Sequence, residues 1–292
     1  MAIRIDKITN GRFGNKILQY SNLMQISNNY KIKASCCKWE GNQFFKNITP
    51  YIPSKKNKRL LFCKKIIENE KLDFNNFDYI LDDPASCLHN VLPHVTKTDP
   101  REFLELKDEY KPKLSDNIIH IGIHCRGGDK LQVSKREIHN YKYYEDSINY
   151  VKNNFINNNN YIFIICTDDI TFFVFKKICS YLKDNNIIYK MGPATQNTKQ
   201  HYIHDWSILS ECDILINNSS TFCVTAGFLG KKKKIIYSKE WIDKNIYHTL
   251  WNNDMNSKIE DYNIIDFRHT FDNFWINVSN NNSNYYYATL LI

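Results

Sequence analysis

Apolar runs that stop abruptly at polar residues recur through the second half of this chain. The clearest extends from Ile118 to Lys130, where closely spaced isoleucines give way to charge and glycine. Such β-branched runs are typical of a strand that is covered on both faces, as in a parallel sheet. We therefore predict a buried strand that leads into a loop carrying functional groups. The same reasoning predicts further strands at 161–166, 187–191, 214–216 and 234–237.

Segments with apolar residues at helical spacing separate these strands. They predict helices at 144–154, 172–182, 206–212 and 222–229, with a turn at Gly192-Pro193. Strands that alternate with helices at these lengths predict an α/β fold, a doubly wound parallel sheet. In such sheets ligands bind at the carboxyl ends of the strands, so the polar loops there are expected to meet at one edge.

The chain begins with a similar unit. Residues 2–8 alternate between apolar and polar positions and predict a strand, glycines from Gly11 predict a turn, and apolar residues from Ile17 predict a helix. Such a turn places backbone N–H groups at a helix N-terminus, where anions bind, but the segment lacks the full dinucleotide or Walker pattern. Residues from about 31 to 110 carry no readable pattern.

A polar, proline-containing stretch at 112–116 is the predicted linker between two domains, and the length of 292 residues agrees with two domains. We predict an N-terminal α/β domain over 1–115 and a C-terminal Rossmann-like domain over 116–242. The remaining residues, 243–292, are expected to form a C-terminal extension that either packs back on the first domain or extends the binding surface.

The loop after the strand that starts at Ile118 contains His124, Arg126 and Asp129 around two glycines. A guanidinium at a strand end, next to residues without side chains, is suited to a bidentate grip on phosphate oxygens. The alternative is a structural ion pair between Arg126 and Asp129. For the loop alone the two interpretations have about equal weight.

Two further loops end in polar side chains. The second predicted strand of this half is followed by Thr167-Asp168-Asp169, and the fourth by Ser219-Ser220-Thr221 at the start of a helix. Hydroxyl and N–H groups at a helix N-terminus hold a pyrophosphate through the helix dipole and unpaired donors. Ordinary N-capping is the alternative, because every helix needs a cap.

Composition narrows the class of ligand. The net charge of +8 favours anionic ligands, but the dense basic run Lys231 to Lys234 has no interleaved aromatic residues, so no nucleic-acid partner is expected. Nine cysteines without CxxC spacing are predicted to be reduced. The absence of a signal peptide and of an apolar span of about 20 residues predicts a soluble, cytoplasmic protein without a membrane span.

Five sequence elements occur in a fixed order: Gly11-Arg12-Phe13-Gly14-Asn15-Lys16-Ile17-Leu18-Gln19-Tyr20; His124-Cys125-Arg126-Gly127-Gly128-Asp129, followed by Tyr143-Tyr144; Thr167-Asp168-Asp169; Asp205-Trp206 through Ser210; and Asn218-Ser219-Ser220-Thr221-Phe222. This order resembles the inverting fucosyltransferases, most closely the α-1,2-fucosyltransferase family, with kinship to the α-1,6- and protein O-fucosyltransferases. The resemblance covers most of the chain.

The resemblance implies a GT-B architecture, two Rossmann-like domains with the donor site in the C-terminal one. It also implies GDP-fucose as donor substrate, a glycan as acceptor and no metal ion. It further implies residue roles: Arg126 at the β-phosphate; His124 and one of Asp168 or Asp169 at the guanine–ribose portion; Ser219, Ser220 and Thr221 at the pyrophosphate; and Gly14 and Asn15 near the sugar-phosphate, from the N-terminal domain.

The sequence departs from the family pattern at two places. Gly127 stands where a second arginine is usual, which removes a supporting charge. Cys223 to Gly227 replaces a tryptophan-rich segment, which leaves donor and acceptor preference open. Three functions therefore remain: a fucosyltransferase, a transferase of the same fold that uses another nucleotide sugar, and a non-catalytic carbohydrate- or nucleic-acid-binding protein.

The group that deprotonates the acceptor is harder to assign. Inversion needs one attacking hydroxyl, which a carboxylate or histidine can deprotonate. Glu137 and His139 follow the loop of Arg126, and Glu137 is the candidate base, although surface charge is the favoured interpretation for both. The grouping His201-x-x-His204-Asp205 is discounted as a metal site, because no third ligand cluster accompanies it and helix capping explains the aspartate.

Overall fold

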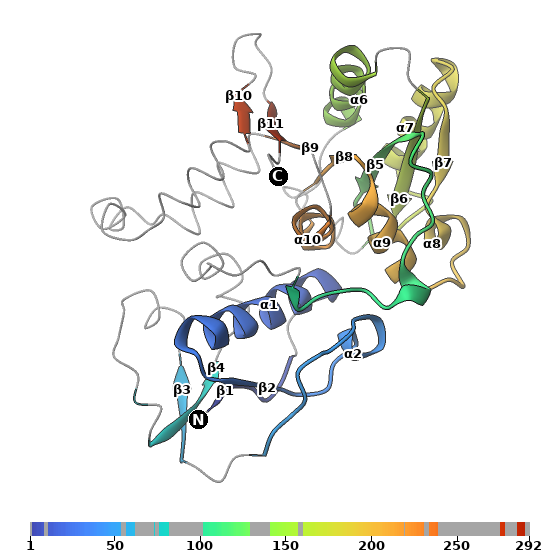
Figure 1. Ribbon diagram of the computed structural model, residues 1–292. Helices are drawn as coiled ribbons and strands as arrows, with labels where there is room; N and C mark the ends of the chain where they lie inside the picture. Colours follow the sequence, from blue (N-terminus) through green and yellow to red (C-terminus); the bar gives the residue numbers. More distant parts are fainter. Residues whose placement is uncertain are drawn as a thin grey trace. The chain divides into compact units, whose positions relative to one another are not determined.

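The computed structural model describes residues 2–8, 11–53, 57–61, 73, 76–81, 102–128, 141–156, 160–218, 220–230, 234–238, 275–277 and 285–289. These residues form two compact units, one within residues 2–107 and the other from Asp108 onward. The boundary comes a few residues before the predicted linker at 112–116. Figure 1 labels the helices and strands of both units.

The first unit is built on a four-stranded parallel sheet in the order β2-β1-β4-β3. Three of its strands lie in the stretch that carried no readable pattern, because polar or charged residues interrupt their apolar runs. Asp78 of β4 is one of them, and its burial is offset by a hydrogen bond of 2.9 Å from the backbone N–H of Ala2. The strands are β1 (Ala2–Ile5), β2 (Lys33–Cys36), β3 (Asn57–Leu61) and β4 (Phe77–Leu81).

Helix α1 (Phe13–Tyr30) follows β1 through the glycine turn and packs against β1 and β2 (Figure 1). The predicted order of strand, turn and helix is confirmed, although the helix begins earlier than predicted. Gly11 has a φ of +81°, and a Cβ on it would lie 1.9 Å from Nδ2 of Asn15, so only glycine fits. A short helix, α2 (Gly41–Phe44), follows β2.

The second unit is built on a seven-stranded sheet in the order β10-β11-β9-β8-β5-β6-β7. The strands from β9 to β7 run parallel, and β11 and β10 are added antiparallel at one edge. All five parallel strands were predicted from the sequence. The strands are β5 (Ile119–Cys125), β6 (Tyr161–Thr167), β7 (Tyr189–Met191), β8 (Ile214–Ile216), β9 (Lys234–Ser238), β10 (Trp275–Asn277) and β11 (Tyr285–Thr289).

Helices connect the successive parallel strands, as predicted. Two details differ. The predicted turn at Gly192-Pro193 starts a short helix, because proline is favoured at the first helical position. The helix predicted from residue 206 begins at Ile203. The helical segments are η3 (Asp108–Tyr110), α6 (Tyr141–Phe155), α7 (Phe173–Asp184), α8 (Pro193–Gln196), α9 (Ile203–Glu211) and α10 (Thr221–Leu229).

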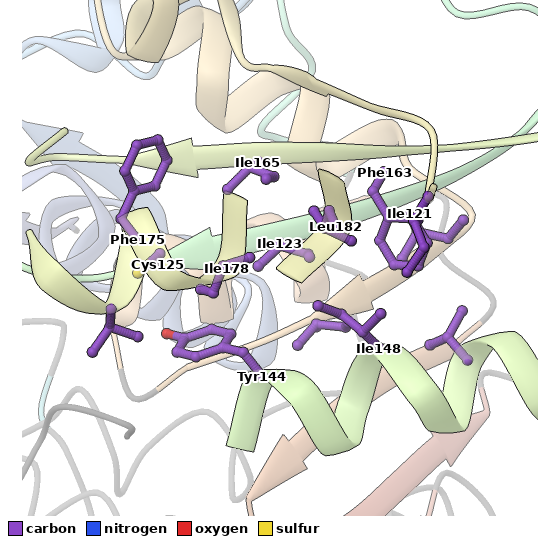
Figure 2. Close-up of a cluster of buried hydrophobic side chains, with 14 of the residues drawn as sticks. Ile121, Ile123, Cys125, Tyr144, Ile148, Phe163, Ile165, Phe175, Ile178 and Leu182 are labelled. Atoms are coloured by element: carbon purple, nitrogen blue, oxygen red, sulfur yellow. The ribbon is translucent and has the colours of Figure 1, made fainter. Parts of the chain in front are cut away.

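The main core of this unit lies between the sheet and helices α6 and α7. Figure 2 shows Ile121, Ile123 and Cys125 of β5 in this core, where they are fully buried. Because side chains alternate across a strand, Gly122 and His124 lie on the opposite face. That face packs against α9. The central strand therefore sends polar and apolar side chains to different faces as it approaches its carboxyl end.

Part of the predicted C-terminal extension belongs to the second unit. β11 pairs with β9 from Tyr285 and Ser238 to Thr289 and Lys234, and β10 pairs with β11. The other residues of 243–292 lie outside the described ranges, so packing of this extension on the first domain stays a prediction. None of the helices that the structure describes has the length and apolar character needed to cross a membrane.

Candidate functional site

The loop after β5 is held by a carboxylate from the neighbouring strand. The register pairs Cys125 of β5 with Thr167 of β6. The polar residues that follow the two strands therefore begin at the same height along the sheet. Nη1 of Arg126 lies 3.1 Å from Oδ2 of Asp168, and the backbone N–H of Gly127 donates to Oδ1 of Asp168 at 2.8 Å. The side chain of Arg126 is only 10% exposed. One carboxylate thus orients both the guanidinium and the backbone of this loop.

The two glycines of the loop are required by their neighbours. Gly128 has a φ of +48°, and a Cβ on it would lie 2.7 Å from Oδ2 of Asp168. A Cβ on Gly127 would lie 2.9 Å from Cγ of Phe172, closer than carbon atoms normally approach. This packing explains why Gly127 stands where the resemblance leads one to expect an arginine, since a side chain there collides with Phe172.

We expect Gly127→Ala to destabilise the protein by about 1–3 kcal/mol, the usual cost of overfilling a packed site. The added methyl group must displace Phe172, and urea unfolding measures the loss. In a Phe172→Ala background the ring atoms nearest to the new methyl group are gone, so the same substitution should cost less. An equal cost in both backgrounds would contradict this explanation.

Asp169 has a different role from Asp168. Its Oδ1 accepts the N–H and the hydroxyl of Thr171 at 2.8 and 2.6 Å, and the hydroxyl contact is the main reason why the pKa of Asp169 is lowered. Its carbonyl accepts the N–H of Phe172 at 3.2 Å, directly before α7. Asp169 therefore stabilises the turn that leads into α7, whereas Asp168 orients the side chain of Arg126. A contact of either aspartate with guanine or ribose stays a prediction.

His124 is tied to the loop that follows β8. Nδ2 of Asn218 donates to the carbonyl of His124 at 2.7 Å, and Oδ1 of Asn218 lies 3.2 Å from Nδ1 of His124. This Oδ1 also accepts the backbone N–H of Ser220 at 2.9 Å. Because an amide oxygen only accepts, the proton of the neutral His124 ring is on Nδ1, and Nε2 carries a lone pair.

Burial keeps the His124 ring neutral. The residue is 3% exposed, and burial lowers the pKa of His124 from 6.5 to about 4, although the nearby Asp168 carboxylate acts in the opposite direction. The ring packs against Phe222 at the start of α10, with ring centres 5.1 Å apart. At neutral pH the site therefore contains a neutral imidazole, which can accept a hydrogen bond through Nε2.

The lowered pKa of His124 predicts a loss of stability in acid. The unfolded chain binds a proton at this histidine near pH 6.5 and the folded chain only near pH 4, so the free energy of unfolding should fall as the pH drops between these values. The full loss attributable to His124 is on the order of 3 kcal/mol. Urea unfolding at about pH 7.5 and about pH 5 should show a smaller loss for His124→Gln than for the wild type. Parallel losses in the two proteins would refute this assignment.

Helix α10 begins without a side-chain cap. Ser220 is its N-cap residue and has extended backbone angles, but its side chain makes no capping hydrogen bond, and the first turn contains no acidic residue. Thr221 is the first helical residue. The N–H groups of a first turn have no partner within the helix, so this helix start is suited to an anion. Ordinary capping by the Ser220 side chain is not what the structure shows, and Ser219 lies outside the described residues.

The segment from Cys223 to Gly227, which departs from the family pattern, is packed interior. Cys223, Thr225 and Ala226 are each 0% exposed. The indole N–H of Trp206 in α9 donates to the hydroxyl of Thr225 at 3.1 Å. The described side chains of this segment therefore hold α10 against α9.

Asp205 caps a helix, as predicted, but not its own. Its carboxylate accepts the N–H of Ala194 at 2.7 Å and the N–H and hydroxyl of Thr195 at 3.0 and 2.6 Å, at the start of α8. Nδ1 of His201 accepts the N–H of Ile203 at 3.2 Å. Among the residues that the structure describes, no group of three or more His, Cys, Asp or Glu side chains gathers as a metal site would require.

Two tyrosines and an asparagine hold the site together, although the sequence assigned them no role. The hydroxyl of Tyr144 donates to the carbonyl of His124 at 3.2 Å, and the hydroxyl of Tyr143 donates to the carbonyl of Asn217. Asn218 joins the loops after β5 and β8 through its hydrogen bonds with His124. The available signal was the pair of tyrosines at the start of the helix after the Arg126 loop.

The remaining predicted site residues lie in the first unit or outside the described residues. Gly14 and Asn15 lie in the first turn of α1, in the first unit, and their approach to a sugar-phosphate stays a prediction. Asp129, Glu137 and His139 lie outside the described residues. The constellation that the structure does show therefore consists of the polar carboxyl ends of β5, β6 and β8.

The chain is similar to known proteins in sequence and in fold. The sequence model of glycosyl transferase family 11 matches residues 102–285. No curated protein sequence matches the chain significantly.

Solved structures of fucosyltransferases are among those similar to the chain. The crystal structure of the fucosyltransferase NodZ from Bradyrhizobium has 14% identity and a TM-score of 0.50, over 80% of this chain and 95% of that one. POFUT1 in complex with GDP-fucose has 10% identity and a TM-score of 0.49, over 79% and 95% of the two chains. A mutant of Arabidopsis thaliana FUT1 in complex with GDP has 10% identity and a TM-score of 0.47, over 81% and 69%. The likeness to NodZ shows the GT-B fold, with Rossmann-like α/β domains.

Proposed function

The chain belongs to glycosyl transferase family 11, the family of α-1,2-fucosyltransferases, and we therefore propose that it transfers L-fucose from GDP-fucose to a hydroxyl group of a glycan acceptor. We further propose that the reaction inverts the anomeric centre, forms an α-1,2 linkage and needs no metal ion. The observation that carries the proposal is the Arg126–Asp168 pair after β5, joined through His124 and Asn218 to the uncapped start of α10.

The leaving group is where this constellation acts. When the bond between C1 of fucose and the β-phosphate oxygen breaks, the electron pair stays with GDP and negative charge develops on its phosphates. The Arg126 guanidinium and the N–H groups at the start of α10 supply hydrogen bonds and positive charge for these oxygens. Donors that are already oriented when charge develops accelerate such a step, and Asp168 keeps Arg126 oriented. In the proposed metal-independent reaction these groups take the place of a metal ion.

The attacking group comes from the acceptor. As positive charge develops at C1, an acceptor hydroxyl attacks from the face opposite to GDP, which inverts the anomeric centre. Its proton passes to a general base. We propose Glu137 as this base. In this reaction fucose moves to the acceptor oxygen, the base receives the hydroxyl proton, and GDP leaves with the electron pair of the broken bond.

Calorimetric titration of the purified protein with GDP, UDP and dTDP tests the donor. GDP should bind and the other two should bind weakly or not at all. Turnover of GDP-fucose should then persist in EDTA, and proton NMR of the fucosylated product should show the inverted anomer. Tighter binding of UDP or dTDP would overturn GDP-fucose as the donor, and binding of none would overturn the transferase assignment for this chain.

A further inference from the structure

Asn217, directly after β8, carries a buried amide without a hydrogen-bond partner. Its exposed fraction is 0%, and neither Oδ1 nor Nδ2 has a partner among the residues that the structure describes. Buried side-chain amides in folded proteins are almost always paired, because an unpaired one keeps the cost of its desolvation. This exception therefore calls for a reason, and a ligand that pairs with the amide supplies one.

The strand register places this amide next to His124. In the parallel pairing of β5 with β8, Ile123 lies opposite Ile216. The next residues, His124 and Asn217, are therefore neighbours as well. Ile123 and Ile216 belong to the core against α6 and α7, in which Figure 2 labels Ile123. Alternation along the strands puts His124 and Asn217 on the other face. The amide and the imidazole are thus side by side at the carboxyl edge of the sheet.

The unpaired groups define the chemistry of the ligand. Oδ1 of Asn217 needs a donor and Nδ2 needs an acceptor, so a phosphate, which only accepts in its ionised form, does not satisfy both. Nε2 of the neutral His124 is a second acceptor. The Watson–Crick edge of guanine presents two donors, N1–H and the 2-amino group, next to the acceptor O6, which matches two acceptors and one donor. Uracil and thymine present one donor between two acceptors, which fits this pair less well.

We propose that Asn217 recognises the guanine base of the donor nucleotide, with Oδ1 accepting from the N1–H edge and Nδ2 donating to O6. The proposal rests on the proposed function, since it takes the donor to be a guanine nucleotide. Because the amide is fully buried, the side chains around it shift when the base binds.

Asn217→Leu is the informative substitution, because leucine has a similar size and removes both polar atoms. The amide is unpaired without ligand, so the urea midpoint of the free protein should stay the same or rise. The dissociation constant for GDP, measured by calorimetry, should increase by about 10- to 100-fold, the range expected for a two-bond contact with a base edge. Affinity for inorganic pyrophosphate should be unchanged, because it has no base.

Asn218→Leu is the matched control. Its amide is paired with His124 and Ser220, so its loss should lower the urea midpoint, which the Asn217 substitution does not. Wild-type protein should also bind GDP more tightly than ADP, and Asn217→Leu should reduce this preference.

The outcomes separate the two proposals. Equal GDP affinity in wild type and Asn217→Leu would overturn the role in base recognition. It would indicate instead that a buried water molecule pairs with the amide. An equal loss of GDP and pyrophosphate affinity would also overturn it, because the base would then not be what the amide contacts. A wild-type protein that binds pyrophosphate or another nucleotide but not GDP would overturn the proposed donor itself.

Discussion

Arg126→Ala should lower turnover of GDP-fucose by about 10²- to 10³-fold, the usual effect of removing one oriented donor from a site of developing charge. The guanidinium is the cation that the structure holds at the carboxyl end of β5, and Asp168 fixes its position at 3.1 Å. Donor hydrolysis measured as GDP release serves as the assay, since it requires no acceptor. Calorimetry with GDP should show weaker binding in the same variant.

The control variants separate charge from geometry. Arg126→Lys keeps the positive charge but not the planar fork, so it should retain part of the activity and remain below wild type. Lys142→Ala removes a cation whose side chain is 65% exposed on α6, and it should leave turnover unchanged. Wild-type turnover in Arg126→Ala would show that the ion pair with Asp168 is structural only.

Asp168→Asn should lower kcat for donor turnover by about 10- to 100-fold, which corresponds to the loss of a charge-assisted hydrogen bond. The amide oxygen of the variant can still accept the N–H of Gly127, so the loop should keep its backbone path. The guanidinium of Arg126, however, loses the negative charge that orients it. Asp168 is thus expected to act as a positioning residue for Arg126.

Guanosine binding distinguishes this role from a contact with the nucleoside. If Asp168 acts through Arg126, Asp168→Asn should bind guanosine as tightly as wild type and GDP more weakly. If Asp168 contacts the ribose or the base, guanosine binding should weaken as well, which would contradict the positioning role. Asp169→Asn is the matched control: it perturbs only the turn with Thr171, so kcat should change far less than in Asp168→Asn.

Much of the second unit could be predicted from the sequence. Its parallel strands are short, nearly continuous apolar runs, and β5 shows why: all its residues from His120 to Cys125 are buried. A continuously buried strand leaves an apolar run that can be recognised in the sequence without knowledge of the fold. The polar residues that follow each run then mark a loop at the carboxyl end of a strand. Arg126, Asp168 and Ser220 were found in this way. In the first unit, polar or charged residues such as Ser35 and Asp78 interrupt the runs, and β2 to β4 were not predicted.

The order of strands and helices in the second unit, the loops that carry polar side chains and the family could thus all be inferred from the residues alone. Which partner each polar group takes is known only from the folded structure. Arg126 pairs with Asp168 because β5 and β6 lie side by side in register, and Asn218 sets the tautomer of His124 because β8 lies on the other side of β5. The physical reason is that periodicity reports the burial of each residue locally. Hydrogen bonds between loops depend on strand neighbours that are far apart along the chain.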